Sequence, residues 1–380
     1  MKIVILPDKF KGSLTASEAA EAIAAGIAPV FPDAELHLFP LADGGEGTLE
    51  SLTGQEGRYV SVPVHDPLMR PRPARYGVRP EGTAVVEMAA ASGLLLLQET
   101  ERDPGRTTSY GFGELIRHAI GQGAKNVILG IGGSATHDCG TGMLAALGMK
   151  FFDRRGKPFL PTGNTLHRIA RFNGTELRTL TAGCRFVTAC DVTTPLTGPD
   201  GAARVYAPQK GAKPDAVEFL ERNTIRLAAL FRQETGRDPQ RIPGGGAAGG
   251  TGATLSLFLD SEPTPGARLS IRLSGAEREI AAADLLVTGE GKADRQTLCG
   301  KLVGEAARLA RSCGLPLVVY CGSLDPEVME AEWTQAGITR IYPLCTEGIS
   351  PEEAMQDAAA LLRETVARTI PDILRTLSAN

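Results

Sequence analysis

The stretch IVILPDKFKGSLTASEAAEAI, residues 3–23, decides the fold of the first part of the chain. It opens with four apolar residues rich in branched side chains, which is typical of a buried parallel strand. Thr15 and Glu18 then form a capping-box pattern, and small apolar residues recur at helical spacing after it. A second strand is expected at 35–39. This order of strand, glycine-containing turn, helix and strand predicts an α/β fold with a parallel sheet.

The last hundred residues repeat this texture. The apolar runs predict a strand, a helix and two further strands at 284–289, 301–312, 316–320 and 340–343. Both ends of the chain therefore predict alternating strands and helices. The simplest architecture is one doubly wound α/β domain that is built from both termini, residues 1–58 plus 284–380.

The middle of the chain differs from both ends. Short alternating segments between Pro- and Gly-bearing turns indicate an antiparallel meander at 59–64, 73–78 and 84–88. A helix, a buried strand and a long helix are expected at 109–121, 126–131 and 215–233. We therefore assign residues 59–283 to an inserted domain of mixed α/β structure. A cleft between two such domains is a usual place for a small-molecule site.

Composition excludes several classes of protein. The chain has 380 residues, 42% hydrophobic and 22% charged, which argues against disorder. Its net charge of −4 makes nucleic-acid binding an improbable main task. The first residues, MKIVILPDK, lack the apolar core of a signal peptide, and no run approaches the roughly 18 apolar residues of a membrane span. Seven cysteines without a C-x-x-C pair indicate neither a disulfide framework nor a zinc site. We expect a cytoplasmic protein, monomeric or homodimeric, with small-molecule partners.

Glycine supplies the strongest functional signal, since it makes up 45 of the 380 residues, near 12% against an average of about 7%. The glycines cluster with acids, Lys, Ser and Thr at 7–13, 42–48, 130–142, 190–212, 243–253 and 288–297. Glycine loops let successive backbone N–H groups bind an anion. Nearby acids can hold Mg²⁺ against a phosphate, and lysine can neutralise a transferring phosphoryl group. Together these features predict phosphoryl transfer.

Two other classes of function stay open on the residues alone. Gly130, Gly132 and Ala135 fit G-x-G-x-x-A after a predicted strand, with Asp153 about 20 residues on, which favours an NAD-dependent dehydrogenase of a small hydroxy acid. Glycines at 140 and 142 interrupt the helix that this motif needs. A non-catalytic small-molecule sensor is the other alternative. No Walker-type phosphate loop is present.

The clusters together resemble the bacterial glycerate kinase type I family across essentially the whole chain. The segments that carry this resemblance are PDKFKGSLTASEAAEAI, ADGGEGT, IGGSAT, GMLAALG, PLTGPDGA, PQKGA, GGGAAGGTGA, TGEG and DRQTLCGK, in the family's order. The resemblance implies ATP-dependent phosphorylation of D-glycerate, with 2-phosphoglycerate favoured over 3-phosphoglycerate, in glyoxylate or sugar-acid breakdown. It also implies one flavodoxin-like domain and one domain similar to restriction endonucleases.

The chain departs from the family pattern at a few positions. His137 and Cys139 stand where the family usually has Asn and Gly, Thr193 and Thr194 replace an acid–Asn pair, and Lys9 replaces a Ser. The chain is also one residue shorter just after position 301. These changes bear on substrate detail and rate more than on reaction class.

The chemistry of in-line transfer assigns roles to the acids. The attacking hydroxyl needs a carboxylate to accept its proton, and Asp191 is our candidate, followed by Asp294. Whichever acid is not the base is expected to hold Mg²⁺ with Glu290.

The remaining candidates bind the two substrates. Lys11 is expected to contact the γ-phosphate or the substrate carboxylate, with Lys210 next and Arg295 as an anion clamp. Ser13 is a further substrate-binding candidate. The expected phosphate loop consists of Gly244, Gly245, Gly246, Gly249, Gly250 and Thr251. The second candidate loop for ATP consists of Gly132, Gly133 and Ser134. The residues expected to face the substrate are Asp43, Gly44, Gly45 and Glu46.

Overall fold

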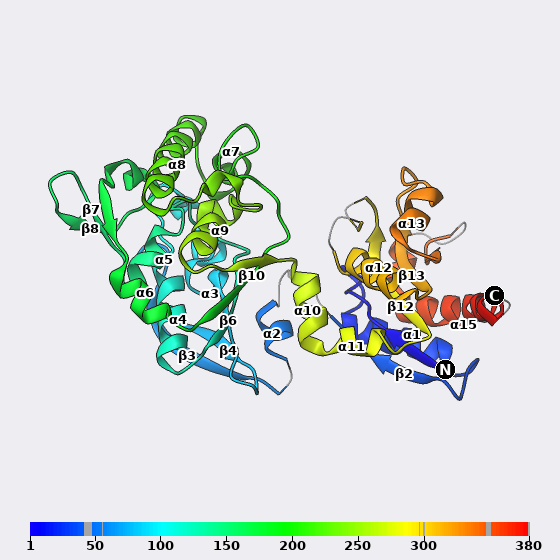
Figure 1. The fold of residues 1–380 in the computed structure, drawn as a ribbon. Coiled ribbons are helices and arrows are strands. Elements are labelled where there is room, and N and C mark those ends of the chain that lie inside the picture. The colour runs from blue at the N-terminus through cyan, green and yellow to red at the C-terminus, as the bar shows by residue number, and fades with distance from the viewer. Residues whose placement is uncertain (42–47, 55, 296, 299–300, 347–350, 379–380) are drawn as a thin grey trace. The chain divides into compact units, whose positions relative to one another are not determined.

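The chain forms two compact units, residues Met1–Gly45 with Pro265–Asn380 and residues Glu46–Thr264 (Figure 1). The structure is a computed structural model, and it describes all residues except 42–47, 55, 296, 299–300, 347–350 and 379–380. The predicted boundaries, 58/59 and 283/284, lie inside these units. Helix α2 (Thr48–Thr53) packs on strands of the second unit, whereas α10 (Gly266–Ser274) and α11 (Ala276–Ile280) pack on α12 of the first.

The first unit is a doubly wound parallel sheet, as predicted. Its strand order is β2-β1-β12-β13-β14, and every neighbouring pair is parallel. Numbered along the unit, this is the order 2-1-3-4-5 of flavodoxin-like folds. The strands and the remaining helices of this unit are β1 (Lys2–Ile5), α1 (Ala16–Ile27), β2 (Glu35–Leu38), β12 (Leu285–Ala293), α12 (Leu302–Cys313), β13 (Leu317–Leu324), α13 (Glu330–Ala336), β14 (Arg340–Pro343), α14 (Pro351–Gln356) and α15 (Ala358–Ser378).

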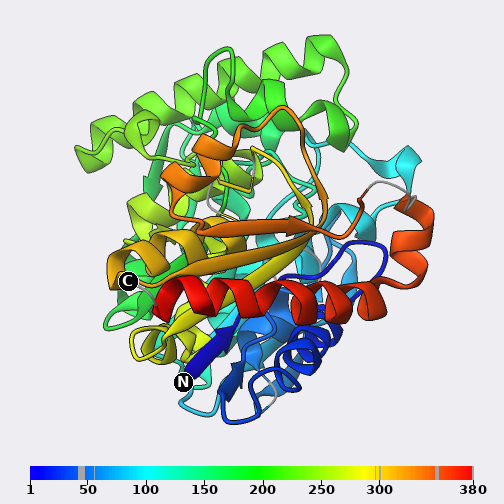
Figure 2. The same cartoon turned by 90° about the vertical axis from the view of Figure 1, so that its right-hand side faces the viewer.

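Successive side chains of β1 and the residue after it point to opposite faces of the sheet, and both faces are covered by helices. Ile3 and Ile5 pack with α1 and α15 on one face, while Val4 and Leu6 pack with α10, α11 and α12 on the other. Figure 2 shows α15, in red, lying across the sheet, and α15 contacts α1. The capping box that starts α1 is confirmed, because the Thr15 hydroxyl accepts from the Glu18 amide at 3.2 Å.

The second unit contains the predicted antiparallel meander within a six-stranded sheet of order β11-β10-β6-β5-β4-β3. Strands β3 to β5 pair antiparallel, and β5, β6, β10 and β11 pair parallel, so the sheet is mixed. A second, three-stranded sheet of order β8-β7-β9 is formed by strands that come between β6 and β10 in the sequence. In the described part of the chain, no helix combines the length and apolar character needed to cross a bilayer.

The elements of the second unit that follow α2 are β3 (Arg58–His65), β4 (Pro71–Val78), β5 (Ala84–Glu87), α3 (Met88–Ser92), η1 (Leu94–Leu96), η2 (Glu99–Glu101), α4 (Tyr110–Gly121), β6 (Asn126–Gly130), α5 (Thr141–Ala146), β7 (Lys150–Phe152), β8 (Pro158–Phe159), η3 (Gly163–Arg168), β9 (Arg171–Asn173), α6 (Thr175–Thr181), β10 (Arg185–Ala189), α7 (Ala202–Tyr206), η4 (Pro208–Lys210), α8 (Pro214–Thr235), η5 (Pro239–Arg241), α9 (Ala247–Phe258) and β11 (Glu262–Thr264).

Candidate active site

Three loops meet at the carboxyl edge of the parallel strands in the second unit. Strands β6 and β10 are neighbours, so the loops that follow them leave the sheet at the same edge. The Gly246 amide donates to Thr194 O at 3.0 Å, and the Cys139 amide donates to Gly249 O at 3.1 Å. The structure thus joins the loop that carries Asp191, the loop after β6 and the start of α9. Asp191 itself is exposed to solvent.

The glycines at the start of α9 serve close packing. Gly244, Gly249 and Gly250 have φ of 68°, 65° and 92°, and a Cβ on Gly249 would lie 2.2 Å from Thr136 O. The amides of Gly245, Gly246 and Gly250 already donate to carbonyls of the protein. The Thr251 hydroxyl donates to Ala248 O at 3.0 Å. These contacts account for this glycine run without a ligand.

The loop after β6 is open where the α9 loop is closed. Gly132 and Gly133 are exposed, and within the described residues their amides donate to no acceptor. Regular helix begins only at Thr141 and lasts six residues as α5. A dinucleotide motif needs a long helix that starts in its glycine loop, so this geometry disfavours the dehydrogenase hypothesis.

Lys210 lies buried behind this open loop. Its side chain is 3% exposed, and Nζ donates to Ser134 Oγ at 2.7 Å and to Thr136 O at 2.8 Å. Burial lowers the pKa of Lys210 to about 7, against a smaller opposing effect of Asp138. The Thr136 hydroxyl is buried with no partner among the described residues. A lysine in this state can hold the loop and place positive charge beneath it.

Asp138 and His137 complete the support of the loop. Asp138 accepts from the Ser109 amide and hydroxyl, both at 2.8 Å, and from the amide of Gly140 at 3.1 Å. His137 is fully buried, with Nε2 3.1 Å from Thr224 Oγ1. Burial lowers the pKa of His137 to about 3, so the imidazole is neutral at pH 7.

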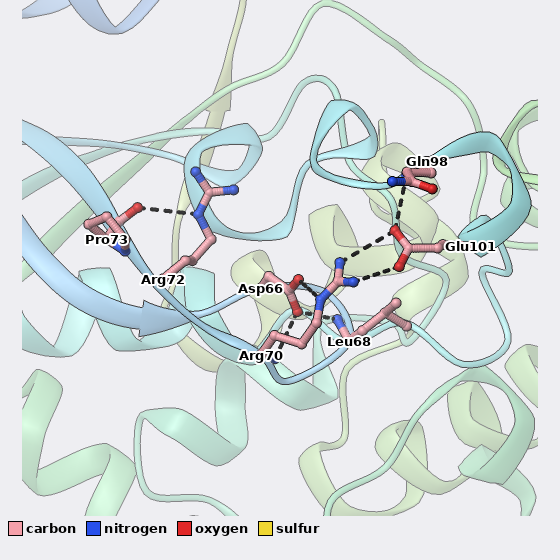
Figure 3. Close-up of polar contacts among 7 residues, drawn as sticks. All are labelled: Asp66, Leu68, Arg70, Arg72, Pro73, Gln98 and Glu101. Atoms are coloured by element: carbon pink, nitrogen blue, oxygen red, sulfur yellow. Dashed lines mark hydrogen bonds and ion pairs between the residues drawn. The ribbon is translucent and has the colours of Figure 1, made fainter.

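An ionic staple, formed by Asp66, Arg70 and Glu101, links the turn after β3 to η2 in segment 93–103 (Figure 3). Arg70 pairs with Asp66 and Glu101 through contacts of 2.5 Å each. The Glu101 carboxylate also accepts from the Gln98 amide at 3.1 Å. This segment pairs with the glycine loop, because the Leu94 amide donates to Gly133 O at 2.8 Å.

Carboxylates gather at the carboxyl edge of the sheet in the first unit. Asp8 follows β1, and Glu290 and Asp294 lie on or just after β12, where the strand order reverses. Ligands of open α/β sheets bind outside such a switch point. Glu290 is 7% exposed, and its Oε1 has no partner among the described residues. Burial raises the pKa of Glu290 to about 7, with smaller upward effects of Asp8 and Asp294.

The other candidates in the first unit have varied surroundings. Lys11 is exposed in the turn after β1, and the Ser13 hydroxyl donates to Phe10 O at 3.1 Å. Arg295 is exposed, with Nε 3.8 Å from Glu332. The candidates at 43–46 lie outside the described residues.

The structure also identifies residues that the sequence argument missed. Asp8 directly follows a strand and stands beside Glu290 in electrostatic range, and this position after a strand was the available signal. The unpartnered hydroxyl of Thr136 carried no signal, because its burial depends on distant parts of the chain.

A bound Mg²⁺ is tested by the donors present. Among the described residues, no group of three or more His, Cys, Asp or Glu side chains is arranged to hold a metal ion. Mg²⁺ in kinases commonly takes only one or two carboxylates and completes its shell with phosphates and water. The unpartnered Glu290 oxygen in an acidic surrounding suits that mode.

Comparison with known proteins then decides the family. The model of the "Glycerate kinase family" matches residues 3–374. The chain belongs to the glycerate kinase family. Glycerate kinase of Halalkalibacterium halodurans is 40% identical over 370 residues, 97% of each chain. Glycerate 2-kinase of Escherichia coli K12 is 39% identical over 380 residues, 100% of this chain and 98% of that one.

A solved structure supports the same membership. A crystal structure from Salmonella typhimurium LT2, assigned as glycerate kinase 2, is similar with a TM-score of 0.83 and 39% identity, covering 100% of this chain and 99% of that chain. The family resemblance expected from the motifs is therefore confirmed. The glycerate kinase family is one of enzymes that transfer phosphoryl groups, in agreement with the chemistry that the glycine clusters predict.

Proposed function

We propose that the chain transfers the γ-phosphoryl group of ATP to the 2-hydroxyl of D-glycerate, forming 2-phosphoglycerate and ADP. The observation that carries this proposal is the open Gly132–Ser134 loop with the buried Lys210 beneath it. Unused amides together with a cation form a ready site for phosphate oxygens. The name of the Escherichia coli relative, glycerate 2-kinase, supports the 2-hydroxyl as acceptor.

The acids supply the proton chemistry. The glycerate oxygen forms a bond to the γ-phosphorus while the bond from this phosphorus to the bridging oxygen of ADP breaks. We assign Asp191 as the acceptor of the hydroxyl proton, with Asp294 as the alternative. Asp191 is exposed at the end of β10, so it is accessible to a substrate.

The charged groups of the first unit are assigned to metal and substrate. Glu290 and Asp294, with Asp191 as a further candidate, would hold Mg²⁺, which neutralises charge on the phosphates when bound. Lys11 is assigned to the γ-phosphate or the glycerate carboxylate, and Ser13 and Arg295 to the substrate. Of the two glycine loops, we favour Gly132–Ser134 for the phosphates, because the amides of the α9 loop are already used.

The experiment is ADP release from ATP and Mg²⁺ with D-glycerate, followed by phosphorus NMR of the product. We expect release that depends on D-glycerate, and a phosphorus signal split by the single proton on C2. A signal split by two protons identifies the 3-hydroxyl and overturns the regiochemistry alone. No release from folded protein that binds ATP overturns the proposed reaction.

A further inference from the structure

The second unit contains a cationic pocket that none of the roles above uses. It has a volume of about 430 Å³ and is lined by Asp153, Arg154, Arg155, His167, Arg168 and Arg226. The turn between β7 and β8, the end of η3 and one face of α8 contribute these side chains. The pocket thus brings four guanidinium groups and one carboxylate together from three separate segments.

The single acid does not neutralise this charge. Asp153 Oδ1 accepts from the amides of Arg155 and Lys157, both at 2.9 Å, and Oδ2 lies 3.9 Å from Arg168 Nη2. The hydrogen bonds from these two amides, together with the nearby charges of Arg168 and Arg155, lower the pKa of Asp153. Asp153 is therefore committed to its own turn and to Arg168.

Three arginines of the pocket form no ion pair within the described residues. Arg154, Arg155 and Arg226 form no ion pair with any carboxylate in the described part of the chain. Arg226 has Arg222 one turn earlier on α8, and like charges at this spacing destabilise a helix. Arg154 and Arg226 therefore have no carboxylate within ion-pair distance among the described residues, and a bound anion would supply one.

The walls of the pocket are fixed in place. Arg168 stacks over the Phe159 ring with 4.9 Å from Cζ to the ring centroid. The Asn223 side chain is buried on α8 and donates to Gly163 O at 3.0 Å, which ties η3 to α8. The Arg168 guanidinium and the backbone of η3 are therefore held before binding, which lowers the entropy that binding costs.

We propose that this pocket binds a small organic anion with two or more negative charges. Guanidinium forks match phosphate and carboxylate oxygens in pairs, and three uncompensated forks suit a ligand with two anionic groups. The volume suits a small acid rather than a polymer. Two sources share this chemistry, a phosphorylated hydroxy acid and a dicarboxylic acid. None of the residues that line this pocket is assigned to the proposed reaction, so the pocket proposal does not depend on the substrate of the enzyme.

The test is calorimetric titration at constant ionic strength with 2-phosphoglycerate, with malate and with lactate as a monovalent control. The variants are Arg154→Gln combined with Arg226→Gln, and Arg222→Gln as the matched control. Arg222 is exposed on the same helix, one turn away, and does not line the pocket. All three substituted side chains are exposed, so the fold should be retained.

We expect 2-phosphoglycerate or malate to bind the wild-type protein and the Arg222→Gln control with equal affinity, and lactate to bind neither. The double variant should lose tenfold or more in affinity, with turnover unchanged. The tighter of the two divalent anions identifies the source. Equal affinity of all three proteins, an equal loss in the control, or no binding of either divalent anion overturns the proposal. Turnover is measured separately, so a failure of the proposed reaction leaves this result readable.

Discussion

The two units present opposite chemistry at the same topological position. At the carboxyl edge of its parallel strands, the first unit gathers Asp8, Glu290 and Asp294. At the corresponding edge, the second unit gathers open glycine amides and the buried ammonium of Lys210. The carboxylates of the first edge suit a cation, and the open amides and the ammonium of the second edge suit an anion, although Lys11 follows β1 and Asp191 follows β10.

The two edges also differ in how the burial of a titratable group affects the stability of the folded state. Burial of Glu290 penalises its charge at high pH, while burial of His137 penalises its charge at low pH. The two edges should therefore respond to pH with opposite signs. Mutations at both edges test this contrast and the proposed proton acceptor, Asp191.

The largest expected effect is at Asp191, the acid that the glycine-rich edge contributes. Asp191→Asn should lower kcat by a factor of about 10² or more, because the attacking hydroxyl loses its proton acceptor. Steady-state kinetics measures this, with Asp200→Asn, an exposed acid near the same loop, as the control. Normal turnover in a folded Asp191 variant removes it from the chemistry and shifts the base to Asp294.

Glu290 tests the acidic edge. Its folded pKa of about 7 lies above the ordinary value of 4.5, so the folded protein keeps a proton that the unfolded chain loses. The contribution of Glu290 to stability is therefore largest below pH 4.5 and is lost as the pH rises through 7. Relative to Glu290→Gln, the wild-type protein should lose about 3 kcal/mol of unfolding free energy between pH 4.5 and 8. Urea unfolding in metal-free buffer measures it, and parallel pH profiles would contradict it.

His137 tests the glycine-rich edge with the opposite sign. Its folded pKa of about 3 lies below the ordinary 6.5, so the contribution to stability is full above pH 6.5 and is lost as the pH falls toward 3. Between pH 7.5 and 4.5 the wild-type protein should lose about 2–3 kcal/mol relative to His137→Asn. The same unfolding series measures this. A loss that is equal in both proteins would show that His137 does not titrate with unfolding.

Lys210→Met should lower kcat about tenfold or more, because the Ser134 hydroxyl and Thr136 carbonyl lose the ammonium that positions the loop. Lys213→Met, an exposed lysine at the start of α8, is the control. Lys210 could act by positioning the loop or by attracting the phosphates. Loss of positioning lowers kcat, whereas loss of simple phosphate attraction raises the KM for ATP alone. Equal kinetics in both variants would detach Lys210 from the phosphate site.

The smallest effect is expected at Arg70, which braces the glycine-rich edge from outside. Its side chain is 49% exposed, so Arg70→Gln should change the global stability little. Amide exchange in segment 93–103 should nevertheless accelerate. Arg72, which contacts only Pro73 O in Figure 3, supplies the control. Unchanged exchange in Arg70→Gln would mean that the staple does not hold this segment.

The strands of the first unit could be predicted from the sequence, because short continuous apolar runs and a capping box are local signals. It ended β12 at 289, whereas the strand runs to Ala293 and pairs with β13 throughout. The predicted strand stops at Gly289, but a Cβ at Gly289 would lie 2.6 Å from Tyr320 O on the neighbouring strand β13. Close packing between strands demands glycine as strongly as a turn does.

The candidate site was less predictable than the fold, because the role of a glycine or a lysine depends on contacts with distant residues. The glycines of the α9 loop and those of the 132–133 loop look alike in the sequence, yet three amides of the α9 loop donate to protein carbonyls, whereas within the described residues those of Gly132 and Gly133 donate to none. Lys210 is predicted from the sequence to contact the γ-phosphate or the substrate carboxylate, but its burial follows from contacts with residues 74 and 76 positions away. Such distant pairings leave no local pattern to find.

The position of β12 has a consequence for synthesis. It pairs with β1 at the centre of the first sheet, yet the Thr288 hydroxyl reaches Leu6 O across 282 residues of chain. As the polypeptide leaves the ribosome, β1 and β2 emerge long before their central partner exists. Residues Glu46–Thr264 are continuous and can complete their own core in that interval. The order of translation therefore makes the inserted unit the first to fold, while the N-terminal strands wait with an open edge that needs protection.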